Sequence, residues 1–489
     1  MEQFSNLNDI SLSLTGALPL AIALALLVPA LRRADNGTTR LPDVSTTTLL
    51  TIIALTVAVM ALVCSCMRYS VLPPGGHDGY FPRAVNLVRS GVFGAGSAPG
   101  ARYPPGYSVL MVPAVWIFGE SRWVFFSTNM ALLAGCSTAV SFMLRGAGLA
   151  PGRANLVALV LFLYPNRLFS TLLPFSDIPF SLVYLLAFLF AVRAAQEPAR
   201  TVLPVASGVL AGIAALIRPA GILLLVPLVI CLLPPSVREP AVAGAKPRPT
   251  LFHARGAGLL AAAALLVLLP WTLRNYIRFG QLIPVASSFG YNLAIGNNPA
   301  SGVTHNGYID SLAQHPAAWR KYGGDTTWNV AQMDTFLLRK GAEFIRDHPG
   351  LFITRGAGKV VHTFASDAST FGMHETYGNL RTIDARVAGA LHAGPLPAAG
   401  FSAAYGLIYR ALFVVNNALY YLTCGLLFVL LFRRRYRWSG ADRAYLAAVI
   451  ITAALVFVLF GISRFKEPIP PLTLILLALR TSPAEPRST

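Results

Sequence analysis

One acidic residue, Asp78, stands in a basic and aromatic loop between two long apolar runs. The loop opens with His77-Asp78-Gly79-Tyr80 and closes with Arg102-Tyr103-Pro104-Pro105-Gly106. A carboxylate here can act as a general base on an acceptor hydroxyl. With His77 it can also contribute to a divalent metal site, although hard cations usually take more oxygen ligands. It can equally cap a helix that begins at Tyr80, and the residue pattern leaves these possibilities open.

Basic residues recur where apolar runs end. Arg102 precedes a double proline, which holds the backbone extended, and its guanidinium fork suits a phosphate. An interfacial arginine that snorkels to the membrane surface is the alternative. Three further arginines occupy similar positions, and all four could converge on one phosphate or pyrophosphate; they are Arg218, Arg274 and Arg464.

A second carboxylate, Asp177, lies in Phe175-Ser176-Asp177-Ile178-Pro179, within or at the edge of an apolar run. An ionisable group inside a bilayer is costly, which makes Asp177 a functional candidate. The alternative is that the run starts at Ile178 and that Asp177 caps it.

The elements that position these residues are predicted to be membrane helices. The chain is 55% hydrophobic and only 12% charged, about half the charge of an ordinary soluble domain. Runs of about 20 apolar residues match the thickness of a bilayer core, so we predict an all-α polytopic membrane protein with about 11–13 transmembrane helices. The expected spans are 14–31, 47–66, 105–119, 122–144, 153–165, 168–193, 201–217, 219–234, 256–273, 405–432, 442–461 and 467–480.

Several function classes are excluded by what the sequence lacks. The net charge of +19 is spread over short loops, without the motifs of nucleic-acid binding. We find no Walker A loop, Rossmann fingerprint, HExxH motif or nucleophile elbow. The five cysteines lie in or beside apolar runs and lack zinc-ligand spacing.

Arginine placement predicts the topology. The cluster Arg433-Arg434-Arg435-Tyr436-Arg437 and the loop 235–255 are expected in the cytoplasm, which leaves the polar segment 275–404 and the Asp78 loop outside. Arg145 and Arg153 favour the cytoplasm, which requires 105–144 to cross once; the sequence leaves this parity open. Within the outer segment, 328–348 is predicted to be an amphipathic helix, followed by a short helix at 351–364.

Taken together, these motifs resemble the GT-C superfamily of membrane glycosyltransferases. The nearest pattern is the bacterial group of dolichyl-phosphate-mannose protein mannosyltransferases and lipid A aminoarabinose transferases. The resemblance covers about residues 47–480. It rests on the Asp78 loop, on Tyr164-Pro165 through Asp177, on Leu216-Ile217-Arg218-Pro219, and on a set of shorter motifs further along: Pro270-Trp271 to Tyr276, Gly296-Asn297-Asn298-Pro299, Phe344 to Pro349, and Arg464-Phe465-Lys466-Glu467-Pro468.

This resemblance implies an inverting hexosyl- or pentosyltransferase of the cell envelope, such as one that glycosylates lipopolysaccharide. The donor would be a polyprenyl-phosphate sugar, and the acceptor a lipid, glycan or protein. Asp78 falls on the position of the catalytic acidic residue, and Asp177 on a second acidic position. The four arginines would hold the donor phosphate; Tyr80, Tyr103 and Asn297 would contact substrate. Many relatives have two adjacent acidic residues where this chain has His77-Asp78, so a metal requirement is not implied.

The resemblance also implies a domain plan and a location. We expect an extra helix and cytoplasmic loop (1–46), a catalytic transmembrane module (47–274, with outer loop 67–105), a periplasmic segment (275–404) and C-terminal transmembrane helices with a short tail (405–489). The arginine-over-lysine and alanine bias indicates a bacterium, hence an inner-membrane protein whose site faces the periplasm. The alternatives are a transporter or flippase of lipid-linked sugars, and a non-catalytic membrane scaffold.

Overall fold

A computed structural model describes residues 43–66, 79–95, 98–233, 250–303, 308–325, 327–365, 398–431, 439–461 and 463–481. The expected first span, 14–31, lies outside these ranges. In the described part, all regular secondary structure is helical apart from one short antiparallel hairpin. Its strands, β1 (Gly94–Ala95) and β2 (Ala98–Pro99), have two residues each. The predicted all-α polytopic fold is therefore confirmed.

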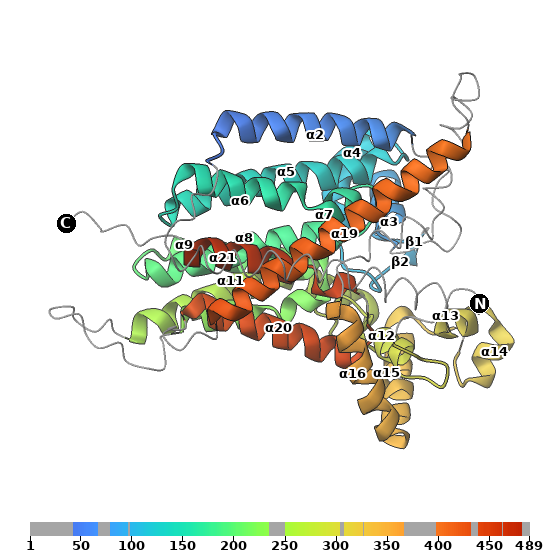
Figure 1. Ribbon diagram of the computed structural model, residues 1–489. Coiled ribbons are helices and arrows are strands. Elements are labelled where there is room, and N and C mark those ends of the chain that lie inside the picture. Colours follow the sequence, from blue (N-terminus) through green and yellow to red (C-terminus); the bar gives the residue numbers. More distant parts are fainter. Residues whose placement is uncertain are drawn as a thin grey trace.

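The helices form an elongated bundle (Figure 1). Among the described residues, six helices are long and apolar enough to cross a membrane: α2 (Thr46–Cys66), α5 (Trp123–Gly146), α8 (Asp177–Gln196), α11 (Thr250–Phe279), α19 (Ala398–Leu431) and α20 (Gly440–Val458). Shorter apolar helices complete the bundle: α6 (Pro151–Leu163), α9 (Val202–Ile217), α10 (Leu225–Leu232) after the 3-10 turn η1 (Pro219–Ile222), and α21 (Ile469–Thr481).

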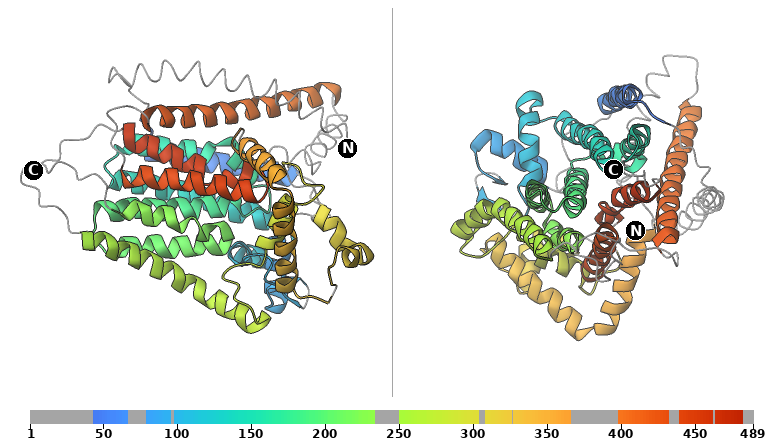
Figure 2. Two further views of the ribbon diagram at one scale, coloured as in Figure 1. Left: turned by 90° about the horizontal axis from the view of Figure 1, so that it is seen from below. Right: turned by 90° about the vertical axis from the view of Figure 1, so that its left-hand side faces the viewer.

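One end of this bundle, which we call the capped end, is covered by the remaining elements (Figures 1 and 2). They are α3 (Tyr80–Ser90), the hairpin, α12 (Phe289–Gly296), α13 (Tyr308–Gln314), α14 (Pro316–Lys321), α15 (Val330–Asp347) and α16 (Pro349–Ala365). Viewed along the bundle, α15 and α16 lie across its axis (Figure 2, right). The predicted helices at 328–348 and 351–364 are confirmed as α15 and α16. Asn329 and Gln332 begin α15 with a reciprocal capping box, which satisfies backbone N–H groups that have no partner within the helix.

The apolar run at 105–119 is not a crossing. It forms α4 (Gly106–Phe118), which starts and ends at the capped end. Gly106 lies against Leu216, near the end of α9, and Arg122, just after α4, donates a hydrogen bond to the Ser65 carbonyl at the end of α2 (2.9 Å). Residues 105–144 therefore cross the bundle once, through α5, which is the parity that Arg145 and Arg153 require.

The single span predicted at 168–193 is wrong at its start. The chain forms the short helix α7 (Pro165–Ser170), then an irregular turn, and then α8, whose first residue is Asp177. Pro174 lies in this turn, and proline disfavours helical conformation in the residue before it. Asp177 is thus at the edge of its helix. We refer below to residues 164–177, which comprise α7, the irregular turn after it and the first residue of α8, as the α7–α8 turn.

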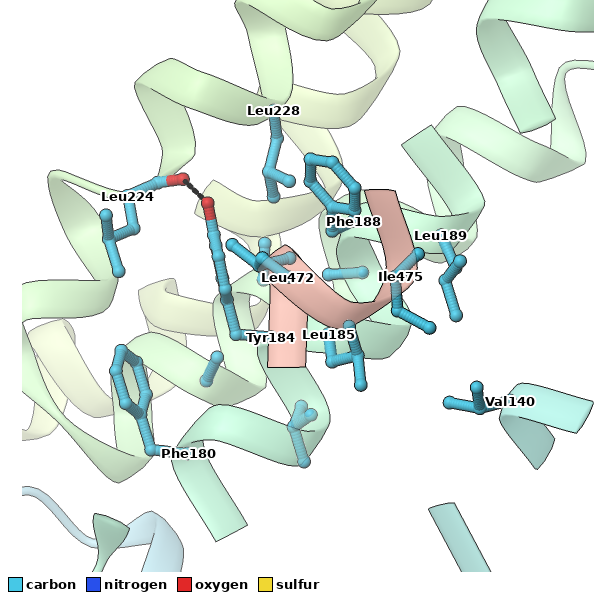
Figure 3. Close-up of a cluster of buried hydrophobic side chains, with 14 of the residues drawn as sticks. Val140, Phe180, Tyr184, Leu185, Phe188, Leu189, Leu224, Leu228, Leu472 and Ile475 are labelled. Carbon is cyan, nitrogen blue, oxygen red and sulfur yellow. Dashed lines mark hydrogen bonds between the residues drawn. The ribbon is translucent and has the colours of Figure 1, made fainter. Parts of the chain in front are cut away.

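Close helix packing holds the bundle together. Lipid tails are as apolar as leucine, so helices in a bilayer associate through tight contact and hydrogen bonds. On α9, Gly208 and Gly212 face α11, and a Cβ at Gly212 would lie 2.8 Å from the Cβ of Val267. At the core, α8 meets α10 and α21 (Figure 3), and the buried Tyr184 donates to the Leu224 carbonyl (3.1 Å). This core fixes the ends of α8 and α9, from which Asp177 and Arg218 project.

Candidate functional site

The proposed catalytic residue Asp78 and its neighbour His77 lie outside the described residues. Gly79, which follows them, is described, and it lies against the side chains of Arg83 and Tyr103. Within the described ranges, no three histidine, cysteine, aspartate or glutamate side chains gather as a metal site would require. Any metal at His77 and Asp78 stays a prediction.

Aromatic residues link the segment between α2 and α4, which we call the first loop, to the α7–α8 turn. The ring of Tyr80 packs edge-on against Tyr103 (5.3 Å between centroids) and Tyr107 (5.5 Å). Tyr107 is buried and donates to the Asn129 amide oxygen (3.0 Å), and Asn129 in turn donates to the Leu173 carbonyl (3.0 Å). The predicted substrate residues Tyr80 and Tyr103 are thus adjacent and are held by residues of the bundle.

Arg83 belongs to this region, although the sequence analysis did not single it out. Its guanidinium donates to the Gly79 carbonyl (2.6 Å) and lies 4.3 Å from the centroid of the Tyr103 ring. Burial and the nearby charge of Arg102 lower the pKa of Arg83, with burial the larger cause. The sequence offers one indication of this role. Arg83 lies three residues after Tyr80 and directly before the buried Ala84, which places it beside the apolar face of α3.

Arg102 connects the first loop to α12 and α15. Its guanidinium lies over the Tyr291 ring, 3.9 Å from the centroid, and its charge acts on Asp334 of α15. Asp334 accepts a hydrogen bond from the Tyr291 N–H (2.8 Å). Burial raises the pKa of Asp334, and the hydrogen bonds from the Tyr291 and Gly290 N–H groups, together with Arg102, oppose that shift.

Arg274 also binds the first loop. It donates to the Gly100 carbonyl (2.8 Å) and, more weakly, to the Phe93 carbonyl (3.3 Å). Its guanidinium lies 4.7 Å from the Trp271 ring centroid, and Trp271 packs on Phe93 (5.1 Å). Arg274 therefore fastens both ends of the β1–β2 hairpin to the end of α11.

Arg218 forms an ion pair with Asp177. Both side chains are largely buried, 12% and 6% exposed respectively, and Phe180 and Phe465 flank the guanidinium at 5.9 and 5.5 Å. Both residues are site candidates from their local sequence, but 41 residues separate them, so their spacing does not indicate that they pair.

The Arg464 motif reaches this ion pair from the C-terminal part of the chain. Only the backbone of Arg464 is described, in the 3-10 turn η2 (Ser463–Lys466). Lys466 is fully buried, donates to the Thr363 carbonyl (2.8 Å) and lies 4.2 Å from the Tyr420 ring centroid. It thus neutralises the negative end of the α16 helix dipole. Glu467 pairs with the buried Arg167 (3.1 Å).

The remaining candidate, Asn297, lies in a tight junction between the outer segment and α20. Its amide donates to the Leu293 carbonyl (2.9 Å) and the Val458 carbonyl (2.7 Å). The buried Lys359 of α16 donates to the Gly296 carbonyl beside it (3.0 Å). A substrate contact of Asn297 stays a prediction.

The four predicted arginines thus fall into two groups. The loop group, Arg102 and Arg274 with Arg83, holds residues 79–102. The bundle group consists of Arg218 and the η2 turn that carries Arg464. The segments that carry the two groups come together at Gly106, where a Cβ would lie only 2.8 Å from the Leu216 carbonyl. This close backbone contact brings the chain after Arg102 to the segment that leads into Arg218, so both groups border one region of the capped end.

Comparisons with known proteins give distant likenesses. No family model matches the chain, and no curated protein does. The Archaeoglobus fulgidus oligosaccharyltransferase aligns with a TM-score of 0.43 and 15% identity over 87% of this chain, which spans only half (50%) of that protein. ArnT from Cupriavidus metallidurans bound to undecaprenyl phosphate aligns with a TM-score of 0.41 and 15% identity, over 89% of this chain and 78% of that one. At these TM-scores the likeness by itself decides neither fold nor activity.

Proposed function

We propose that this multi-pass membrane protein is an inverting glycosyltransferase of the bacterial inner membrane. It moves a sugar from a polyprenyl-phosphate donor to a lipid, glycan or protein acceptor at the periplasmic face. The family motifs of the sequence support this proposal. The single structural observation that supports it is the close contact of Gly106 with Leu216, which brings the chain after Arg102, with its packed Tyr80 and Tyr103 rings, to the segment that leads into Arg218.

The reaction is a single displacement. The acceptor hydroxyl attacks the anomeric carbon, its proton passes to Asp78 as general base, and the bond from that carbon to the phosphate oxygen breaks. Attack from the face opposite the leaving group inverts the anomeric centre. The phosphate gains one negative charge as it leaves, and preorganised cations stabilise such charge best where water is scarce. Arg102 is the principal candidate, because it lies on the loop that carries Asp78.

The bundle cations have a different part in this proposal. Arg218 is already neutralised by Asp177, so it contributes less net charge than Arg102. The pair can still act on the donor, because a phosphate that approaches Arg218 competes with Asp177 for the guanidinium. Asp177 then limits how tightly the lipid phosphate is held, which favours release of the product.

A transfer assay with purified protein tests the proposal. The protein is incubated with a panel of polyprenyl-phosphate sugars and a bacterial membrane lipid extract, with and without chelator, and products are identified by mass spectrometry. Asp78→Asn is compared with Asp43→Asn, an exposed carboxylate at the opposite end of the bundle. We expect a glycosylated product with the wild type and Asp43→Asn, and a rate lower by about 10²–10⁴ with Asp78→Asn.

Two results would contradict the proposal. An Asp78→Asn protein with wild-type activity removes the proposed base. Movement of the lipid-linked sugar across a vesicle membrane, without any new glycosidic bond, establishes a transporter of lipid-linked sugars instead. Activity that survives chelator shows that the reaction needs no dissociable metal, whereas loss that Mg²⁺ or Mn²⁺ restores assigns one.

A further inference from the structure

Two buried ion pairs of opposite orientation flank the α7–α8 turn. At its start, the cation Arg167 belongs to the turn, and its partner Glu467 comes from the segment after η2 (3.1 Å). At its end, the anion Asp177 belongs to the turn, and its partner Arg218 follows α9. The side chains of Arg167 and Glu467 are only 2% and 4% exposed, so this pair is too deep in the protein to be a surface contact.

The two pairs are joined through Phe465. The ring of Phe465 lies 5.5 Å from the guanidinium carbon of Arg218 and packs against Phe460 (5.1 Å). Phe465 and Glu467 are two residues apart, within η2 and the turn that follows it. Arg167 donates to the Glu467 backbone carbonyl (3.2 Å) as well as to its carboxylate, so it holds the main chain of this segment in addition to the side chain.

Phe465 is connected to Glu467 through the backbone of η2. This 3-10 turn ends at Lys466, directly before Glu467, and α21 begins at Ile469. Lys466, between Phe465 and Glu467, is itself held by the Thr363 carbonyl (2.8 Å). We therefore expect a displacement of Glu467 to move Phe465, and with it one wall of the Arg218 guanidinium.

We propose that Arg167 is a positioning residue for the donor phosphate site: through Glu467 it holds Phe465 against Arg218, and so directs the guanidinium of Arg218. This inference rests on the proposed function, because that function makes Arg218 a phosphate contact. Buried ion pairs often add little net stability, since apolar residues of similar volume can replace them at no cost. Orientation is the property that such a replacement removes.

A purely stabilising role predicts a different outcome for one variant. Arg167→Met with Glu467→Leu removes both charges but keeps the volume, so it leaves no uncompensated buried ion. If the pair serves only the fold, this double variant binds the donor phosphate as the wild type does, whatever its melting temperature. If the pair positions Arg218, the double variant keeps its melting temperature but binds the donor phosphate more weakly.

The experiment measures the melting temperature, the Kd for a sugar-free polyprenyl phosphate in detergent, and the KM and kcat of transfer. The matched control is Arg193→Met with Glu197→Leu, a half-buried pair at the opposite end of the bundle. For Arg167→Met with Glu467→Leu we expect a melting temperature near that of the wild type, a Kd and KM raised about tenfold, as one well-oriented charged hydrogen bond provides, and little change in kcat.

A second comparison tests whether the effect passes through Arg218. In an Arg218→Gln background, the Arg167→Met and Glu467→Leu changes should raise Kd no further, because residues that act through a shared partner are not additive. A wild-type Kd in the Arg167→Met with Glu467→Leu variant overturns the inference. So does a tenfold increase in Kd when the same two changes are made in the Arg218→Gln background. The Kd needs no turnover, so a wild type that binds the lipid phosphate but transfers no sugar refutes the proposed function and leaves this inference standing.

Discussion

Arg102 and Arg274 are held at the capped end by aromatic rings and backbone carbonyls, whereas Arg218 and Arg167 are held by carboxylates in the interior. The loop group is only partly buried, and water still screens its charge. The side chains of Arg218 and Arg167 are only 12% and 2% exposed, and an unpaired charge in such surroundings would cost several kcal/mol. The two settings therefore solve the same problem, the placement of a cation, in different ways.

This difference indicates a division of labour. A guanidinium that is stacked on a ring and bonded to neutral carbonyls keeps its full charge for an incoming phosphate. A guanidinium that is paired with a carboxylate contributes geometry, and its charge becomes available only in competition with its partner. All four arginines lie where apolar runs end, and their partners distinguish Arg102 and Arg274 from Arg218.

Breaking a bundle pair should have the largest effect on stability. Asp177→Asn leaves Arg218 buried without its counterion, and we expect a loss of about 3–5 kcal/mol, seen as a lower melting temperature in detergent and a lower yield of folded protein. The double variant Asp177→Leu with Arg218→Met should recover most of that loss. Equal melting temperatures for Asp177→Asn and the wild type would show that the pair is not buried as described.

Lys359 tests the effect of burial on a cation that is held by a neutral group. It is fully buried, and its ammonium group donates to the Gly296 carbonyl. Burial, with Arg355 as a smaller cause, lowers the pKa of Lys359 from 10.5 to about 8. Between these two pH values the unfolded chain binds this proton and the folded chain does not, so stability should rise with pH, by at most about 3 kcal/mol.

The Lys359 prediction is checked by melting in detergent from pH 7.5 to 10.5, with Lys359→Met beside the wild type. The mutant removes this titration, so the difference between the two proteins isolates the contribution of Lys359. A difference that does not change with pH over this interval would mean that Lys359 titrates near its ordinary value.

The smallest effect on stability is expected in the loop group. Arg102→Gln removes a cation that is partly exposed and stacked on Tyr291, a contact that contributes about 0.5–1 kcal/mol. Activity should nevertheless fall, with a higher KM for the donor, while Arg89→Gln, an exposed arginine paired with Glu120, should leave it unchanged. A large drop in melting temperature for Arg102→Gln, without a change in KM, would assign it a structural role and erase the contrast with Arg218.

The sequence located most helices because membrane helices are encoded locally. Runs such as 47–66, 122–144 and 442–461 are apolar over the length of a crossing, and the structure forms α2, α5 and α20 there. The amphipathic spacing at 328–348 likewise yielded α15. Arg145 and Arg153 favoured a single crossing by residues 105–144, because positive charge near a helix end is itself a local signal, but the sequence left this parity open.

Tertiary structure decided which residues meet. Nothing local shows that α4 ends at the end of the bundle where it began; this follows from the contact of Gly106 with Leu216 and the hydrogen bond from Arg122 to the Ser65 carbonyl. Nor does the spacing of Asp177 and Arg218, or of Arg167 and Glu467, indicate that they pair, since their partners come from helices that are far apart in the chain. A residue's own neighbours in sequence fix whether its segment is helical and apolar, but the partner of a buried charge depends on how distant helices pack, and that is set only when the whole bundle forms.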